Sequence, residues 1–149
     1  MNQIKKFSKI IVAIDGSTNS FEAAEHGISM AKKDNAKLIV ISIIHTPASV
    51  LTYSTEKSFK EFLKKSRDET EGWFGKIRKK ASEIGVEIKT DTVEEIYSIP
   101  GAIIKYAEQE KADVIVVGGT GKSGFKNLLL GSVSGDVVRY ARCPVLVVK

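Results

Sequence analysis

The sequence predicts an α/β fold, in which one open parallel sheet of five strands carries helices on both faces. Two observations point to it. Short apolar runs, typical of strands, alternate with longer segments in which apolar residues recur every three or four positions, as they do in helices. This alternation continues along the whole chain without a linker, repeat or low-complexity segment. Because strands that alternate with helices form parallel sheets, residues 1–149 are expected to make one domain.

The first two strands are continuous aliphatic runs, Ile10–Ile14 and Leu38–Ile44. A strand without polar alternation is expected to be buried on both faces of its sheet. A helix separates the two runs and is expected to continue to about Lys33. It is expected to start near Asn19, because Glu22, three residues later, resembles the partner in a capping box.

A long helix dominates the middle of the chain. Polar residues at 45–55 predict a loop, and helical spacing of aromatic and aliphatic residues then predicts a helix from Glu56 to Ile84. Two interior glycines, Gly72 and Gly75, each cost about 1 kcal/mol relative to alanine. A bend or a division of the helix is therefore expected there, and Gly85 is placed at its C-terminal cap.

Two further strand–helix pairs and a last strand complete the fold. Strict alternation at Val86–Val93 predicts a half-exposed strand near the sheet edge. The next helix begins around Pro100, whose missing N–H does no harm in a first turn. The remaining elements are a strand at Val114–Val117, a helix from about Ser132 to Ala141 and a terminal strand at Val145–Val148.

The order of the strands predicts where a ligand binds. Right-handed crossovers give a Rossmann-like order of 3-2-1-4-5, with the strands numbered along the chain. The winding reverses between the first and fourth strands, and ligands of such sheets bind outside the carboxyl ends of the strands at that reversal. Asp15 ends the first strand and Gly118 ends the fourth. The two positions are therefore expected to lie side by side at a ligand site.

The segment VIVVGGTGKSGFKNLLLGSV, residues 114–133, indicates the kind of ligand. Its apolar run ends in closely spaced glycines, and a second break, Gly131-Ser132, opens a short helical pattern. Glycines leave backbone N–H groups accessible, and the N–H groups at a helix start attract anions. The first glycines are Gly118, Gly119, Gly121 and Gly124. The sequence thus predicts that this segment holds the phosphates of a nucleotide.

Three motifs compete to explain these glycines. Gly121-Lys122-Ser123 looks like the end of a P-loop, but that motif needs a glycine at position 116, where Val116 stands. The stretch 119–124 fits the dinucleotide pattern GxGxxG, yet it follows the fourth strand and no acidic residue lies about 20 positions further on. The third spacing is Gly118-x2-Gly121-x9-Gly131-Ser132.

That third spacing resembles the nucleotide-binding signature of the universal stress protein family, in its ATP-binding branch. The resemblance extends over essentially the whole chain. It includes the opening IIVAIDGS, the segment LLLGSVS and the ending CPVLVVK. Two loop positions depart from the commonest family pattern: Gly119 replaces the usual Ser or Thr, and Thr120 the usual His or Arg.

The resemblance implies a bound ATP and names the residues around it. The adenine and ribose side would be lined by Ala13, Ile14, Asp15 and, through its backbone, Ile43. Residues passing close to the ribose and phosphates would be Val117, Gly118 and Gly121. The phosphate chain would be held by Lys122, Ser123, Gly131, Ser132, Val133 and Ser134. Simpler structural interpretations remain open, with Ser132 or Asp15 acting as a helix cap and Lys122 as a solvated loop residue.

Three functions are compatible with this site. The first is an ATP-binding, nucleotide-dependent switch in a stress response, acting on an unidentified regulatory protein partner. The second is a slow or partner-activated ATPase: Asp15 can help to hold the Mg²⁺ or Mn²⁺ of a metal–ATP complex, but no Walker-type lysine, general base or arginine can be assigned. The third is an interaction protein that binds no nucleotide, and the retained glycine spacing argues against it.

Composition narrows the partners and the compartment. The net charge of +5 is modest, and its basic clusters alternate with acidic residues as on a solvated helix face, so neither nucleic acid nor membrane is an expected partner. The single cysteine, Cys143, cannot form an internal disulfide, which fits a reducing, cytoplasmic location. The apolar strand Val145–Val148 is expected at the sheet edge. The family resemblance implies a homodimer in which these strands pair antiparallel.

Overall fold

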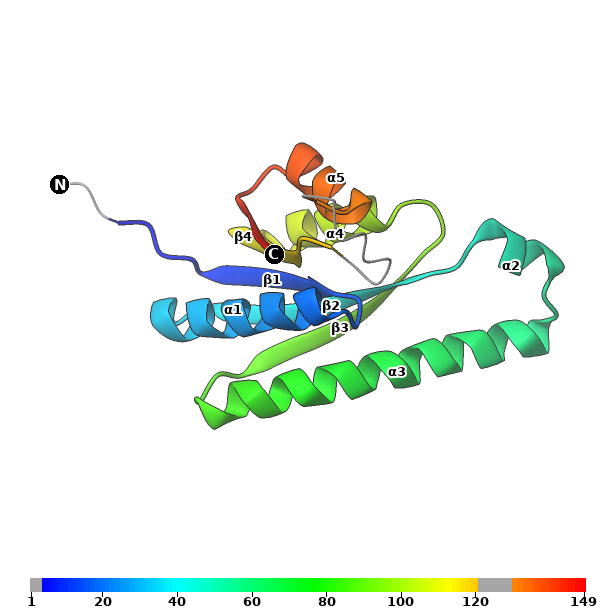
Figure 1. The fold of residues 1–149 in the computed structure, drawn as a ribbon, viewed down its shortest axis with the longest axis horizontal. Coiled ribbons are helices and arrows are strands. Elements are labelled where there is room, and N and C mark those ends of the chain that lie inside the picture. The colour runs from blue at the N-terminus through cyan, green and yellow to red at the C-terminus, as the bar shows by residue number, and fades with distance from the viewer. Residues whose placement is uncertain (1–3, 121–129) are drawn as a thin grey trace.

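The structure is a computed structural model that describes residues 4–120 and 130–149. One parallel sheet has the strand order β3-β2-β1-β4-β5, which confirms the expected order (Figure 1). The strands are β1 (Lys9–Ile14), β2 (Lys37–His45), β3 (Ile88–Glu95), β4 (Val114–Gly118) and β5 (Val145–Val148). The half-exposed β3 and the short β5 form the two edges, as the sequence predicts.

Helices cover both faces of the sheet. They are α1 (Thr18–Asp34), α2 (Ala48–Tyr53), α3 (Glu56–Glu83), α4 (Ile99–Glu110) and α5 (Ser132–Tyr140). Helices α1 and α3 pack on one face, and α4 and α5 pack on the other (Figure 1). No helix in the described part of the chain is both long and apolar enough to cross a membrane.

The continuous aliphatic strands are explained by two cores, one on each face. In β1, Ile10, Val12 and Ile14 point toward α1 and α3, whereas Ile11 points toward α4 and α5. All four of these side chains are almost completely buried. A central strand with helices on both sides has no solvent-facing position, so its sequence shows no polar alternation.

Helix α3 differs from the expectation because it is a single, continuous helix of 28 residues. The expected bend or division at Gly72 and Gly75 is wrong. Both glycines lie on the open side of the helix, where an added Cβ would meet nothing within 4 Å. The opposite side buries an uninterrupted apolar stripe that includes Phe74, Ile77 and Ala81. Packing of that stripe outweighs the intrinsic cost of the two glycines.

Three smaller boundaries also differ. Helix α1 is capped by Ser17, whose side chain accepts a hydrogen bond from the Ser20 N–H, and not by Asn19. Strand β3 starts at Ile88, because the N–H of Val86 bonds to the Ala81 carbonyl and so completes the end of α3. The expected loop at 45–55 contains the short helix α2, none of whose residues is buried. Without a buried side, α2 has no apolar periodicity to reveal it.

Candidate functional site

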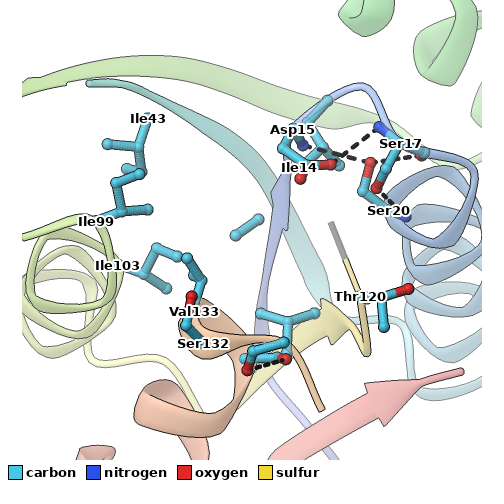
Figure 2. Close-up of a pocket in the computed structure, with 15 residues that line it drawn as sticks. Ile14, Asp15, Ser17, Ser20, Ile43, Ile99, Ile103, Thr120, Ser132 and Val133 are labelled. Carbon is cyan, nitrogen blue, oxygen red and sulfur yellow. Dashed lines mark hydrogen bonds between the residues drawn. The ribbon is translucent and has the colours of Figure 1, made fainter. Parts of the chain in front are cut away.

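A pocket of about 300 Å³ opens at the carboxyl ends of the central strands (Figure 2). Its walls come from the ends of β1, β2 and β4 and from the N-terminal turns of α1, α4 and α5. This is the point where the winding of the sheet reverses, between β1 and β4. The pocket therefore lies where a sheet of this topology is expected to bind a ligand.

The residues nominated from the sequence converge on this pocket. All of them that the structure describes line it: Ala13, Ile14, Asp15, Ile43, Val117, Gly118, Gly131, Ser132, Val133 and Ser134. The other nominated residues, Gly121, Lys122 and Ser123, lie outside the described residues. Segments more than a hundred positions apart in the sequence thus share one wall.

One side of the pocket is the start of α5. Its N-cap is Gly131, which has no side chain to accept hydrogen bonds from the first turn, and that turn contains no acidic residue. By contrast, α1, α3 and α4 are capped by the hydroxyls of Ser17, Thr55 and Ser98. The first N–H groups of a helix have no partner inside the helix. In the described structure, those of α5 are left for a ligand, and an anion suits them best.

The alternative role of Ser132 as a helix cap is wrong, because Ser132 is the first residue inside α5 and Gly131 precedes it as the cap. The sequence alone does not tell which residue of the dipeptide Gly131-Ser132 is the N-cap, because glycine and serine are both common at N-cap positions. The consequence is favourable for binding: the N–H of Ser132 belongs to the group of uncapped amides.

Hydrogen bonds tie the two ends of the glycine-rich segment together. The Gly119 carbonyl accepts from the Gly131 N–H at 2.6 Å and from the Ser134 hydroxyl at 2.8 Å. The Gly119 N–H in turn donates to the Val148 carbonyl at 2.7 Å, which extends the ladder between β4 and β5. The start of α5 is therefore fixed against the end of β4. The Ser134 hydroxyl already donates its proton to Gly119, so the group that Ser134 can donate to a ligand is its backbone N–H.

The turn between β1 and α1 forms a second side. The Asp15 carboxylate accepts the Ser17 N–H at 2.9 Å, and the Asp15 N–H donates to the Ser20 hydroxyl at 3.3 Å. The alternative role of Asp15 as the cap of α1 is wrong, because Ser17 is the N-cap. The Asp15 carboxylate instead shapes the turn before the helix, and its exposed side chain lines the pocket. No cluster of three or more His, Cys, Asp or Glu residues occurs in the described ranges. A divalent cation beside Asp15 would take its remaining ligands from a bound phosphate chain and water.

The third side is apolar. Figure 2 shows Ile43, Ile99 and Ile103 together, across the pocket from Asp15 and Ser17. Ile99 and Ile103 are one turn apart on α4. The turn before α4 is shaped by the Glu95 carboxylate, which accepts the N–H groups of Ile96 and Tyr97. The hydrogen bond from Tyr97 is the main cause that lowers the pKa of Glu95, so the carboxylate stays ionised in this role.

Sequence reasoning missed several lining residues: Ser17, Ser20, Ile99, Ile103 and Thr120. Ile103 and Ala107 stand at helical spacing in the sequence, which indicates core residues and gives no sign that Ile103 lines a pocket. Thr120 accepts a hydrogen bond from the Asn19 side-chain amide at 2.6 Å. That contact joins the glycine-rich segment to the start of α1, and no local pattern reveals it because the partners are 101 residues apart.

Comparison with known proteins identifies the family. The model of the universal stress protein family matches residues 6–149. Universal stress protein MJ0531 of Methanocaldococcus jannaschii is 38% identical over 143 residues, which cover 96% of this chain and 82% of that protein. The solved structure of hypothetical protein MJ0577 superposes with a TM-score of 0.84 at 28% identity and covers 97% of both chains. A universal stress protein solved in complex with cAMP has a TM-score of 0.63 at 27% identity and covers 97% of this chain and 98% of its own. On these matches, the chain belongs to the universal stress protein family.

Proposed function

We propose that the protein binds an adenine nucleotide in this pocket, specifically ATP with Mg²⁺ or Mn²⁺, and acts as a nucleotide-dependent switch in a stress response. One observation carries the proposal: the uncapped first turn of α5 faces a pocket whose other side is apolar. Ile43, Ile99 and Ile103 suit a nucleobase, which is flat and largely apolar on its faces. The N–H groups of Ser132, Val133 and Ser134 suit phosphate oxygens.

The energies are of the right size. A hydrogen bond to a charged group contributes about 1.5–3 kcal/mol. Three or four such bonds supply much of the roughly 8 kcal/mol of a micromolar complex. The related protein solved with cAMP supports adenine as the base, because cAMP shares its adenine, ribose and a phosphate with ATP.

Binding would order the elements around the pocket, and this is how the switch would act. Phosphates held at α5 would also engage the glycine-rich segment, whose ends are fixed at Gly119 and Gly131. A regulatory protein that recognises the ordered surface would then sense the nucleotide. We further propose a homodimer, in which the exposed edge of β5 pairs with the same strand of a second copy.

A calorimetric titration with ATP tests the binding proposal. Gly131→Val is the decisive variant: the backbone at Gly131 is extended (φ −68°, ψ 167°), which valine tolerates, and the nearest atom to an added Cβ is the Gly119 carbonyl oxygen at 3.4 Å. The fold should survive while the two methyl groups obstruct the approach to the amides, so affinity should fall at least roughly thirtyfold, the factor that about 2 kcal/mol corresponds to.

Gly135→Val is the matched control, because it makes the same change four residues along, where an added Cβ meets nothing within 4 Å. It should bind ATP like the wild type. Wild-type affinity in a folded Gly131→Val protein would contradict the proposal. Failure of the wild-type protein to bind any adenine nucleotide would favour an interaction protein that needs none.

A slow ATPase is the second candidate, favoured by the position of the Asp15 carboxylate at the mouth. Phosphoryl transfer to water needs a metal beside the phosphates, and Asp15 is the acidic residue among those lining the pocket. Steady release of phosphate from ATP, lost in Asp15→Ala while ATP still binds, would establish hydrolysis. Release no faster than in a protein-free control would leave the protein as a binding module.

A further inference from the structure

The side chain of Trp73, on α3, lies directly against Gly16, in the turn between β1 and α1. A Cβ added to Gly16 would be 2.4 Å from Cζ2 and 2.5 Å from Cε2 of the indole. The aromatic ring therefore already fills the space that a side chain would take. Gly16 also has φ +82°, a conformation in which other residues are strained. Its two neighbours, Asp15 and Ser17, both line the pocket.

Helix α3 brings the indole to this turn as one end of an ordered interface with α1. One turn further along α3, Lys76 stands over the ring of Phe21, with its Nζ atom 5.9 Å from the ring centroid. After one more turn, Lys80 forms an ion pair with Glu25. The same stretch of α3 is anchored in the core by fully buried side chains, among them Phe74 and Ile77.

The hydrogen bonds of the turn described above are made by Asp15 and Ser17 and not by Gly16, which lies between them. They join Asp15 and Ser17 to each other and to Ser20 on α1, a helix that packs in the same core. Contact with Trp73 adds a second support, because it links Gly16 itself to α3. Removing the indole would leave a gap beside a glycine, the residue with the greatest backbone freedom.

We propose that Trp73 is a positioning residue for the pocket: its indole supports Gly16 and thereby fixes the Asp15 carboxylate and the Ser17 hydroxyl opposite the first turn of α5. The inference rests on the proposed nucleotide binding and adds a residue that does not itself line the pocket. Ordering a binding site when the ligand arrives costs free energy and so lowers the affinity. Trp73 would keep this free-energy cost low by holding the turn in place before ATP binds.

A double-mutant cycle on ATP affinity tests this role. Trp73→Ala should weaken ATP binding roughly tenfold, the factor that about 1.4 kcal/mol corresponds to. Asp15→Ala should weaken it as well. Because Trp73 acts through the turn that carries Asp15, the double variant should lose clearly less than the product of the two single losses. Losses that multiply, or a folded Trp73→Ala protein with wild-type affinity, would overturn the inference.

Ile77→Ala separates positioning from general loosening of the core. Ile77 is one turn further along α3, is 2% exposed and belongs to the same core. Ile77→Ala should lower the unfolding temperature yet keep ATP affinity within about twofold. An affinity loss equal to that of Trp73→Ala would attribute the effect to loosening and refute the positioning role.

If Trp73→Ala does not fold, Trp73→Leu takes its place in the cycle with the same criteria. The wild-type titration separates the two claims. If the wild-type protein binds no ATP, the proposed function is wrong. If the wild-type protein binds ATP but the affinity losses of the two single variants multiply in the double variant, only the role of Trp73 is wrong.

Discussion

Gly118 and Gly131 border the same pocket, but packing excludes a side chain only at Gly118. At Gly118, an added Cβ would lie 2.9 Å from the carbonyl carbon of Asn19 and 3.0 Å from the backbone nitrogen of Ser20. The strand and the helix approach so closely there that a methyl group displaces backbone. At Gly131, the nearest atom is 3.4 Å away. Gly118 therefore serves packing, whereas the role proposed for Gly131 is to leave the α5 amides accessible to a ligand.

The difference gives a prediction about stability. Gly118→Ala should destabilise the fold by about 1–3 kcal/mol, the usual cost of forcing extra volume into a packed site. Gly135→Ala, at a helical position where nothing lies within 4 Å, should instead stabilise it by up to about 1 kcal/mol. Urea denaturation of both variants measures the two effects. A Gly118→Ala protein as stable as the wild type would show that α1 yields easily at this contact.

At the residue scale, the sequence predicted the positions that line the pocket well and the contacts between distant residues poorly. The positions Asp15, Gly118 and Gly131 follow from motif spacing and from the reversal of the sheet, and all three line the pocket. The helical spacing of Trp73 indicates a core or interface aromatic, and the indole does pack against the core. Its contact with Gly16 joins residues 57 positions apart, and such pairs are set by helix packing rather than by a local pattern.

At the scale of elements, β5 is one of the two edge strands, and no described strand pairs with its outer side. Parallel pairing uses the Pro144 and Val148 carbonyls to bond β4. Because the backbone groups of a strand alternate in direction, Val145 and Val147 point their N–H and carbonyl groups away from the sheet. Leu146, on β5 itself, has 37% of its surface accessible. Such an edge can pair with a second chain.

Val147→Pro tests the proposed homodimer. Proline removes one outward N–H without breaking a bond to β4, so it should block pairing between copies while the sheet survives. Val147→Ala is the control, since it loses similar packing and keeps the N–H. Light scattering should give half the wild-type mass for the proline variant and the full mass for the alanine variant. A proline variant that remains a dimer would place the interface elsewhere.

Elements were predictable where one side is buried and unpredictable where it is not. The strands and helices α1, α4 and α5 follow from apolar periodicity, with boundaries shifted by a residue or two. Helix α2 was missed because none of its residues is buried. The continuity of α3 was missed because a propensity argument at Gly72 and Gly75 ignored the buried stripe on the opposite side. Tertiary packing decided the case of α3.

At the scale of the whole molecule, the pocket exists only when the fold is complete. Its lining residues are spread from Ala13 to Ser134 and come from both layers of helices. Unfolding therefore destroys the site, and a ligand that binds only the folded protein stabilises it by mass action. Ligand binding at the pocket can therefore be measured as an increase in the stability of the whole protein.

ATP should accordingly raise the thermal unfolding temperature. At a concentration one hundred times the dissociation constant, ligand binding adds about 2.7 kcal/mol of stability, which for a chain of this size is a shift of roughly 5–10 °C. Calorimetry or circular dichroism measures it. The shift should vanish in Gly131→Val and persist in Gly135→Val. An equal shift in both variants would mean that ATP binds away from α5.

The proposed nucleotide binding depends on the first amides of α5 holding phosphate, and their NMR signals test that most directly. Addition of ATP to the labelled protein should move the amide signals of Ser132, Val133 and Ser134 strongly, whereas adenosine, which lacks phosphates, should move them far less. Saturable ATP binding that leaves these three signals in place would contradict the account.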